Sequence, residues 1–196
     1  KSVLVRFPNG GQIVGNVEKS GSEKNQKSKE EKKHILAEKF GFAEHEKLIV
    51  SAGAEFKYKN IVGFQFDMFV KTLLKKFNGK ATFLIIGADK ESDKWKRLYE
   101  QTNGKGRAIG ILPRKYMDEL IEVADLYILS FPMIGAGAMV AEKAKVPYLA
   151  LFITERGMDL YGHNAARTVD ELLEKSLDVL NGQSDCYLGQ MAKSFG

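Results

Sequence analysis

Short apolar runs alternate along this chain with segments whose apolar residues recur at helical spacing. Five runs have the length and composition of buried strands: residues 48–52, 82–86, 107–111, 126–129 and 148–152. In the segment from Asn60 to Phe77, apolar residues recur every three or four positions, which predicts an amphipathic helix. The pattern therefore predicts strand–helix alternation from Lys47 onward.

Start and stop signals place further helices. A polar helix through Trp95 follows the second strand, and Pro113 opens another, since proline is favoured in a first helical turn. Thr168 and Glu171 form a capping box for a helix that ends near Leu180. A last helical stretch is predicted over residues 187–195.

Continuous apolar strands that alternate with amphipathic helices indicate a parallel sheet covered on both faces. Right-handed crossovers then make the expected fold an α/β, Rossmann-like, doubly wound parallel sheet with helices on both faces. We expect one domain over residues 47–196, preceded by an arm with a short helix over residues 1–46.

Composition narrows the class of protein. The chain has 196 residues, of which 44% are hydrophobic and 28% charged, as expected for one soluble globular domain. Its apolar runs are far shorter than the ~20 residues that span a bilayer, and its first residues do not resemble a signal peptide. The single cysteine, Cys186, suits a reducing compartment. We expect a cytoplasmic protein, or one at the cytoplasmic face of a membrane.

The formal net charge is +5, and much of the excess lies between Lys19 and Lys33. Lysines there alternate with glutamates, which is typical of a solvated segment. No aromatic residue occurs between Ser20 and Lys33, so nucleic acid is not an expected partner. The excess instead favours a phosphate-bearing small molecule or, in the full-length protein, peripheral contact with an anionic membrane surface.

In open sheets of this kind, ligands bind outside the carboxyl ends of the strands. The loop after the fourth strand contains Gly135, Ala136 and Gly137 and leads into a helix, where backbone N–H groups can cradle a diphosphate. Tight helix packing explains such glycines equally well. Glu142 follows on this helix and can accept hydrogen bonds from a ribose diol, or be a solvated glutamate.

The loop after the first strand contains Lys57 and Lys59, either of which can neutralise a phosphate, although exposed loop lysines are common. Asp125 precedes its strand, so we expect it at the opposite edge, where it caps or ends structure. His163 has no second histidine or cysteine at ligand spacing, so a metal site is not expected.

Six segments then carry a family resemblance. They are Pro-Asn-Gly at 8–10, the short helix at 36–41, the loop at 51–60, the turn at 86–89, the segment at 109–112 and Ala-Asp at 124–125. In order and spacing they resemble the C-terminal, donor-binding domain of retaining, family 4-like (group 1) glycosyltransferases, which is one half of a GT-B fold.

The resemblance implies a hexosyltransferase-type enzyme of polysaccharide or glycoconjugate synthesis that transfers a sugar from a nucleotide sugar, with UDP the expected carrier and no metal or other cofactor. The acceptor would bind an N-terminal domain outside this chain, so the chain alone is expected to bind nucleotide without turnover. Lys59 and Glu142 would be catalytic. The expected substrate-binding residues are Gly53, Lys57, Lys59, Gly87, Leu112, Gly135, Ala136, Gly137 and Glu142.

Two departures keep other interpretations open. Ala54 stands where the family has an arginine, and Ile134 stands where it has the first of two glutamates. Lys57 is close enough to Lys59 to replace the lost charge. The chain could instead be a catalytically degenerate nucleotide-sugar-binding or interaction domain, or half of a sugar-nucleotide 2-epimerase. A receiver-like signalling domain is disfavoured, because Glu55 is the only acid directly after the first strand.

Overall fold

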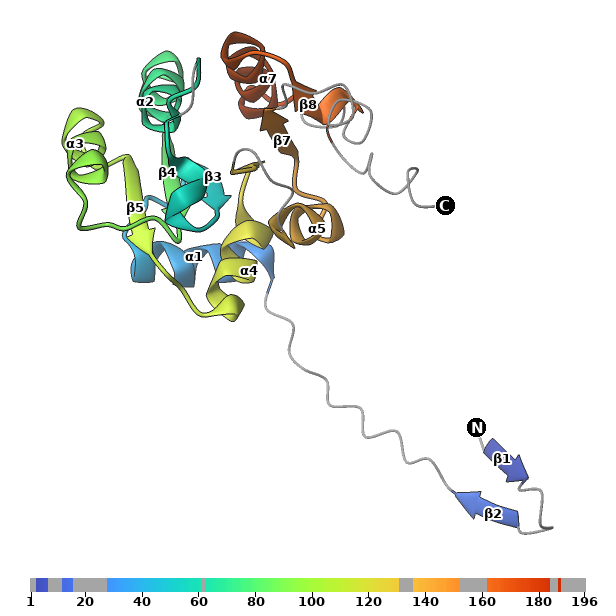
Figure 1. Cartoon of the computed structure of the whole chain (residues 1–196). Helices are drawn as coiled ribbons and strands as arrows, with labels where there is room; N and C mark the ends of the chain where they lie inside the picture. Colours follow the sequence, from blue (N-terminus) through green and yellow to red (C-terminus); the bar gives the residue numbers. More distant parts are fainter. Residues whose placement is uncertain are drawn as a thin grey trace.

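The computed structural model describes residues 28–60, 63–130, 136–151, 162–183 and 187, together with the backbone of residues 3–6 and 12–15. Six of its strands form one sheet in the order β5-β4-β3-β6-β7-β8, and every neighbouring pair is parallel (Figure 1). These strands are β3 (Lys47–Ala52), β4 (Ala81–Ile86), β5 (Gly106–Gly110), β6 (Leu126–Ile128), β7 (Tyr148–Leu151) and β8 (Ala165–Ala166).

Helices cover both faces of this sheet. They are α1 (Lys29–Phe40), α2 (Phe66–Lys76), α3 (Asp93–Gln101), α4 (Arg114–Val123), α5 (Ala136–Lys143) and α7 (Val169–Leu180), with 3-10 turns η1 (Glu55–Tyr58) and η2 (Gly162–Asn164). In Figure 1, α2, α3 and α7 lie on one side of the sheet, and α1, α4 and α5 lie on the other.

Each face has its own hydrophobic core. Ile49 of β3 belongs to the core shared with α2, α3 and α7, whereas its neighbours Leu48 and Val50 belong to the core shared with α1, α4 and α5. All three side chains are fully buried. Successive strand residues point to opposite faces, so a continuous apolar run is what a sheet covered on both sides requires. The predicted α/β, doubly wound fold is confirmed.

Some boundaries differ from the predictions. Helix α2 begins at Phe66 rather than near Asn60, because Gly63 has a φ of +80° and Gln65 has an extended backbone, and neither conformation fits a right-handed helix. Strand β8 is only two alanines long, too short to give a strand pattern, and was not predicted. Strands β1 (Val3–Arg6) and β2 (Gln12–Gly15) form an antiparallel pair within the predicted arm. The helix predicted over residues 187–195 lies outside the described residues except for Tyr187.

Helix α1, which the sequence analysis grouped with the arm, packs on the sheet domain. Its Leu36 and Ala37 are buried in the second core, and its Lys32 pairs with Glu122 of α4 at 3.1 Å. Its N-terminus is capped by Ser28, whose hydroxyl accepts a hydrogen bond from Glu31 N at 3.1 Å.

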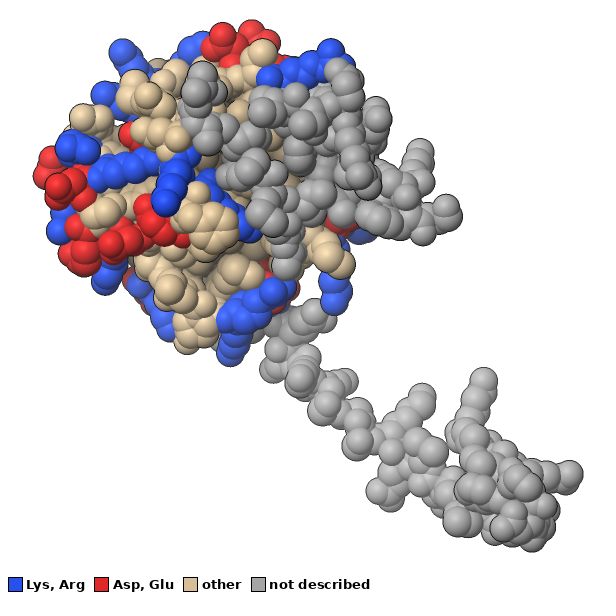
Figure 2. Space-filling model, viewed as in Figure 1, with Lys and Arg blue, Asp and Glu red and all other residues tan. Residues whose placement is uncertain are grey.

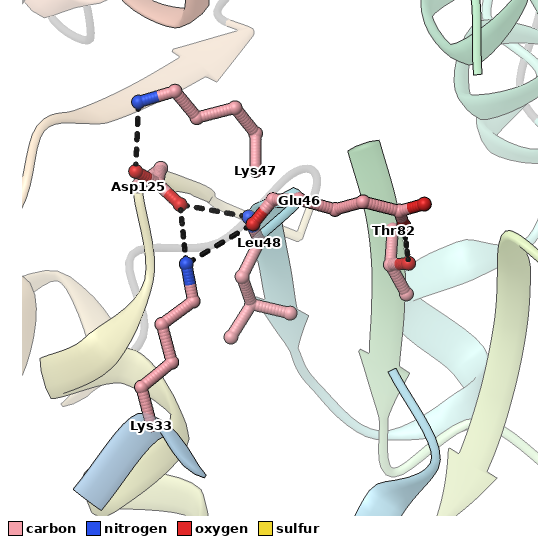
Figure 3. A network of polar contacts seen from close by, with 6 residues as sticks. All are labelled: Lys33, Glu46, Lys47, Leu48, Thr82 and Asp125. Carbon is pink, nitrogen blue, oxygen red and sulfur yellow. Dashed lines mark hydrogen bonds and ion pairs between the residues drawn. The ribbon is translucent and has the colours of Figure 1, made fainter. Parts of the chain in front are cut away.

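Asp125 lies at the amino edge of the sheet, as predicted, and joins three elements there (Figure 3). Its carboxylate accepts a hydrogen bond from Leu48 N at 2.8 Å and pairs with Lys47 at 3.0 Å and Lys33 of α1 at 3.4 Å. Burial alone would raise the pKa of Asp125, but the hydrogen bond from Leu48 and the two ammonium groups outweigh it and hold the pKa below its usual value. Asp125 therefore ties α1 and β3 to the start of β6.

The strand order fixes where a ligand can bind. The chain builds outward from β3 through β4 to β5, then returns to the other side of β3 and builds from β6 through β7 to β8. The direction reverses between β3 and β6. In open α/β sheets the ligand crevice lies at such a switch point, outside the carboxyl ends of the strands.

Candidate functional site

A cavity of about 770 Å³ opens at the carboxyl edge of the sheet. Its walls are the loops that follow β3, β4 and β5, which contribute lining residues from the ranges 52–57, 86–91 and 110–112. Met117 of α4 and Gly137 of α5 complete the described lining. The cavity thus reaches from the outer strand β5 across the switch point to α5.

Glycines bring the first two loops together. Gly87 has a φ of +86°, and a Cβ atom there would lie 2.3 Å from the carbonyl oxygen of Gly53. A Cβ atom on Gly53 would in turn lie 2.5 Å from Ser130 Oγ. No side chain fits at either position, so the two loops present backbone to the cavity.

Gly137 has a packing role as well as a place in the cavity wall. A Cβ atom there would lie 2.0 Å from the hydroxyl oxygen of Tyr127 on β6. The packing explanation that the sequence left open therefore holds for this glycine, because α5 could not approach β6 so closely with a larger residue. Anion binding by the same backbone stays a prediction.

The two candidate lysines have different environments. Lys57 is half-buried and lines the cavity, and its side chain runs back over Gly53, since a Cβ atom on Gly53 would lie 3.2 Å from Lys57 Cδ. Lys59 is exposed, directly follows η1 and is not among the described lining residues. Lys57 lies within η1 and Lys59 directly follows it, so two lysines only two positions apart differ in exposure: one lines the cavity and the other faces solvent.

The remaining predicted site residues divide in the same way. Gly53, Gly87, Leu112 and Gly137 line the cavity with Lys57. Glu142 is half-buried on α5 and does not appear in the described lining; its Oε1 is buried without a hydrogen-bond partner among the described residues. Gly135 lies outside the described residues, as does Ile134, and only the backbone of Ala136 is described.

Sequence reasoning gave no role to Glu55, the first residue of η1, which lines the cavity. Its Oε2 accepts hydrogen bonds from Asp89 N at 2.7 Å and from Trp95 Nε1 at 3.2 Å. Asp89 and Trp95 lie 34 and 40 residues further along the chain, so no local pattern could have predicted these contacts. The only sequence signal was an acid directly after the glycine turn.

Tyr58 anchors the other end of η1. Its side chain is buried against Phe66 and Trp95, and its hydroxyl lies 3.2 Å from Ser51 Oγ. Burial raises the pKa of Tyr58 far above its usual value, so the phenol stays protonated. Lys94 Nζ donates to the carbonyl of Tyr58 at 2.5 Å.

The charged residues in the lining are of both signs. Lys57 and Lys90 are basic, and Glu55, Asp89 and Glu91 are acidic. Basic and acidic side chains are also interspersed over the face of the molecule in Figure 2. Within the described part of the chain, no group of three or more His, Cys, Asp or Glu side chains could hold a metal ion.

Comparison with known proteins bears on the fold. No protein-family model and no curated protein matches the sequence. Solved structures do match. HepE of Anabaena, determined with UDP and glucose, superposes with a TM-score of 0.60 at 15% identity over 83% of this chain and 46% of its own. ADP-heptose heptosyltransferase II of E. coli superposes with a TM-score of 0.54 at 16% identity, over 78% of this chain and 52% of its own. The chain has the fold of one domain of a GT-B glycosyltransferase.

A glycosyltransferase of Rickettsia africae ESF-5 gives a further match, with a TM-score of 0.60 at 13% identity over 84% of this chain and 45% of its own. The chain thus spans about half the length of the GT-B structures it matches. None of the helices in the described residues is long and apolar enough to cross a membrane.

Proposed function

We propose that this GT-B domain binds the donor of a glycosyltransferase and that the donor is a nucleotide sugar, with UDP as the expected carrier. One observation carries the proposal: the cavity at the carboxyl edge brings together backbone-exposing glycines and the ammonium-bearing Lys57. Because glycines have no side chain, a diphosphate can approach their backbone N–H groups, and a lysine neutralises the charge of the diphosphate. HepE and S. aureus TarM, which share this fold, were determined with UDP bound.

The diphosphate would lie between the first loop and the N-terminus of α5. Lys57 would neutralise it, and the first amides of α5, at Ala136 and Gly137, would donate to it. Helix N-termini favour anions through their unpaired N–H groups and their dipole. Ala54 brings no charge to this wall, and Lys57 supplies one three residues later.

The nucleobase would lie further out, against the loop after β5. Ile111 and Leu112 and the side chain of Met117 give this part of the cavity an apolar wall. Ile111 is 89% exposed, so its side chain is free to pack on a ligand. A flat base with polar edges suits an apolar wall that also offers backbone groups.

In transfer with retention, the bond between the anomeric carbon and the diphosphate oxygen breaks, and the acceptor takes the sugar with its configuration unchanged. The domain's own part would be to position the donor and stabilise the departing diphosphate electrostatically. Lys57 would do this directly. Glu142 has one carboxylate oxygen without a partner among the described residues, but it lies outside the described cavity lining, so its bond to the ribose stays a prediction from the family resemblance.

The test compares Lys57→Ala with Lys59→Ala in calorimetric titrations with UDP. Removing a charged hydrogen bond to a phosphate costs about 1.5–3 kcal/mol, which is roughly a 10- to 150-fold loss of affinity. We expect that loss for Lys57→Ala and a smaller one for Lys59→Ala, whose side chain is exposed. Lys75→Ala, on the last turn of α2 and absent from the described lining, is the control. Equal affinities of wild type and Lys57→Ala would contradict the proposal.

A second candidate is a domain that binds nucleotide sugars but has lost catalysis. Ala54 favours it, because the cavity lining has a methyl group where the resemblance leads us to expect a guanidinium. Ala54→Arg in the full-length protein distinguishes the two. A large gain of sugar transfer would favour the degenerate domain, whereas unchanged transfer by an already active protein would favour the enzyme.

A further inference from the structure

We propose that Glu55 is a positioning residue: it fixes the spacing of the loops after β3 and β4 and so holds Lys57 in place to meet the donor diphosphate. The inference rests on the proposed function and extends it to a residue that does not itself bind the phosphate. It also makes the single tryptophan, Trp95, a built-in reporter of the site.

The carboxylate of Glu55 joins two separate segments. Its Oε2 accepts from Asp89 N at 2.7 Å, in the loop after β4, and from Trp95 Nε1 at 3.2 Å, in α3. Trp95 Nε1 also lies 3.3 Å from Oε1. Hydrogen bonds to an ionised acceptor are about twice as strong as neutral ones. Glu55 therefore ties the cavity's first wall to its second.

Burial makes the contact with Trp95 necessary. Trp95 is only 1% exposed, so its indole N–H has lost access to water and needs an acceptor in the protein. Among the described residues, Glu55 provides the acceptor for this N–H. The glutamate is thus held by a group that cannot turn outward to solvent.

Lys57 lies between the two fixed ends of η1. Glu55 holds the first residue of this four-residue turn, and the buried Tyr58 holds the last. Within the turn, Lys57 N donates to Ala54 O at 2.9 Å. With both ends fixed, the backbone of Lys57 has little freedom, and its side chain stays directed over Gly53 into the cavity.

Glu55 cannot be an anion ligand itself, since its charge opposes a diphosphate. This separates positioning from a purely electrostatic role. A positioning role needs an oxygen at the place of Oε2, and glutamine can supply it without the charge. An electrostatic role needs only the charge, so removing it by glutamine or by alanine would have the same effect.

The experiment is a titration of the 196-residue chain with UDP, for wild type, Glu55→Gln and Glu55→Ala. We expect Glu55→Ala to weaken UDP binding at least tenfold and Glu55→Gln to stay within about threefold of wild type. Glu91→Ala is the matched control, because Glu91 is a cavity-lining acid that pairs with Lys96 at 3.2 Å. That variant should bind UDP at least as tightly as wild type.

Trp95 fluorescence gives a second measurement. Without ligand, Glu55→Ala should change the fluorescence emission of Trp95, whereas Glu55→Gln and Glu91→Ala should leave it near that of wild type. Addition of UDP to wild type should also change this emission. Trp95→Phe keeps an aromatic ring in the core, although a smaller one, and removes the N–H. Combined with Glu55→Ala it should give less than additive losses of UDP affinity, because the two changes break one contact.

The contrary outcomes are distinct. The positioning role would be overturned if Glu55→Ala bound UDP as tightly as wild type, or if both Glu55 variants bound it equally and more tightly than wild type. Either result would leave the proposed function standing. Failure of wild type to bind UDP, GDP or ADP would overturn the proposed function and this role together. If Glu55→Ala no longer unfolds cooperatively, Trp95→Phe takes its place in the titration. Unchanged UDP affinity of Trp95→Phe would then overturn the positioning role of Glu55.

Discussion

Single positions at the carboxyl edge decide what the cavity can bind. Lys57 and Lys59 carry the same charge two residues apart, yet one lines the cavity and the other is exposed. The family resemblance pointed to Lys59 because it matches by spacing alone. The 3-10 turn that redirects these side chains depends on the buried Tyr58 and on Glu55, and neither contact is visible in a linear sequence.

Gly137 offers a prediction at this scale. A methyl group there would meet the Tyr127 hydroxyl at 2.0 Å, well inside contact distance. Overpacking of this kind costs about 1–3 kcal/mol. We expect Gly137→Ala to lower the free energy of unfolding by that amount, measured by urea denaturation. Stability equal to that of wild type would mean that α5 can move away from β6 at little cost.

At the scale of elements, the apolar pattern was sufficient to predict the strands from β3 to β7 and the helices between them. Strands β3, β4, β6 and β7 are buried almost throughout, so their runs of apolar residues are continuous and easily recognised. The edge strand β5 is only partly buried beyond Gly106. Strand β8 is two alanines, and the backbone of Gly63 and Gln65 delays the start of α2, so the apolar pattern predicted neither. The glycine loops could be located by spacing, but their partners, such as Ser130 for Gly53, required the fold.

The contacts of Asp125 yield a prediction about how these elements hold together. Its folded-state pKa lies below its usual value, so its contribution to stability is present above the usual carboxyl pKa of about 4 and is lost as the pH falls through the lower, folded value. At pH 7, Asp125→Ala should lose about 1.5–3 kcal/mol, since Leu48 N would lack a charged acceptor.

Urea unfolding of wild type and Asp125→Ala at several pH values checks this. The difference in the free energy of unfolding between the two should be largest at neutral pH. It should shrink in acid, where the aspartate of wild type becomes protonated and loses its charge. Asp125→Asn, which keeps an acceptor oxygen for Leu48 N, should fall between them at pH 7. A difference that stays constant as the pH falls from 7 through the folded-state pKa of Asp125 would show that its charge does not contribute to stability.

At the scale of the whole chain, the fold is that of one domain of GT-B glycosyltransferases, and the chain spans about half the length of the HepE and heptosyltransferase structures. Among the described residues, a hydrophobic core packs on each face of the six-stranded sheet, ion pairs join its amino edge to α1, and the cavity lies at its carboxyl edge. Under the proposed function, this domain would bind the nucleotide sugar at that edge.

The proposed function requires first that this domain binds a nucleoside diphosphate in the cavity lined by Lys57. The most direct test is calorimetric titration of the wild-type chain with UDP, GDP and ADP, each with and without Mg²⁺. We expect saturable binding of at least one of them, tightest for UDP and unchanged by Mg²⁺. Absence of binding by all three, or binding that appears only with Mg²⁺, would contradict it.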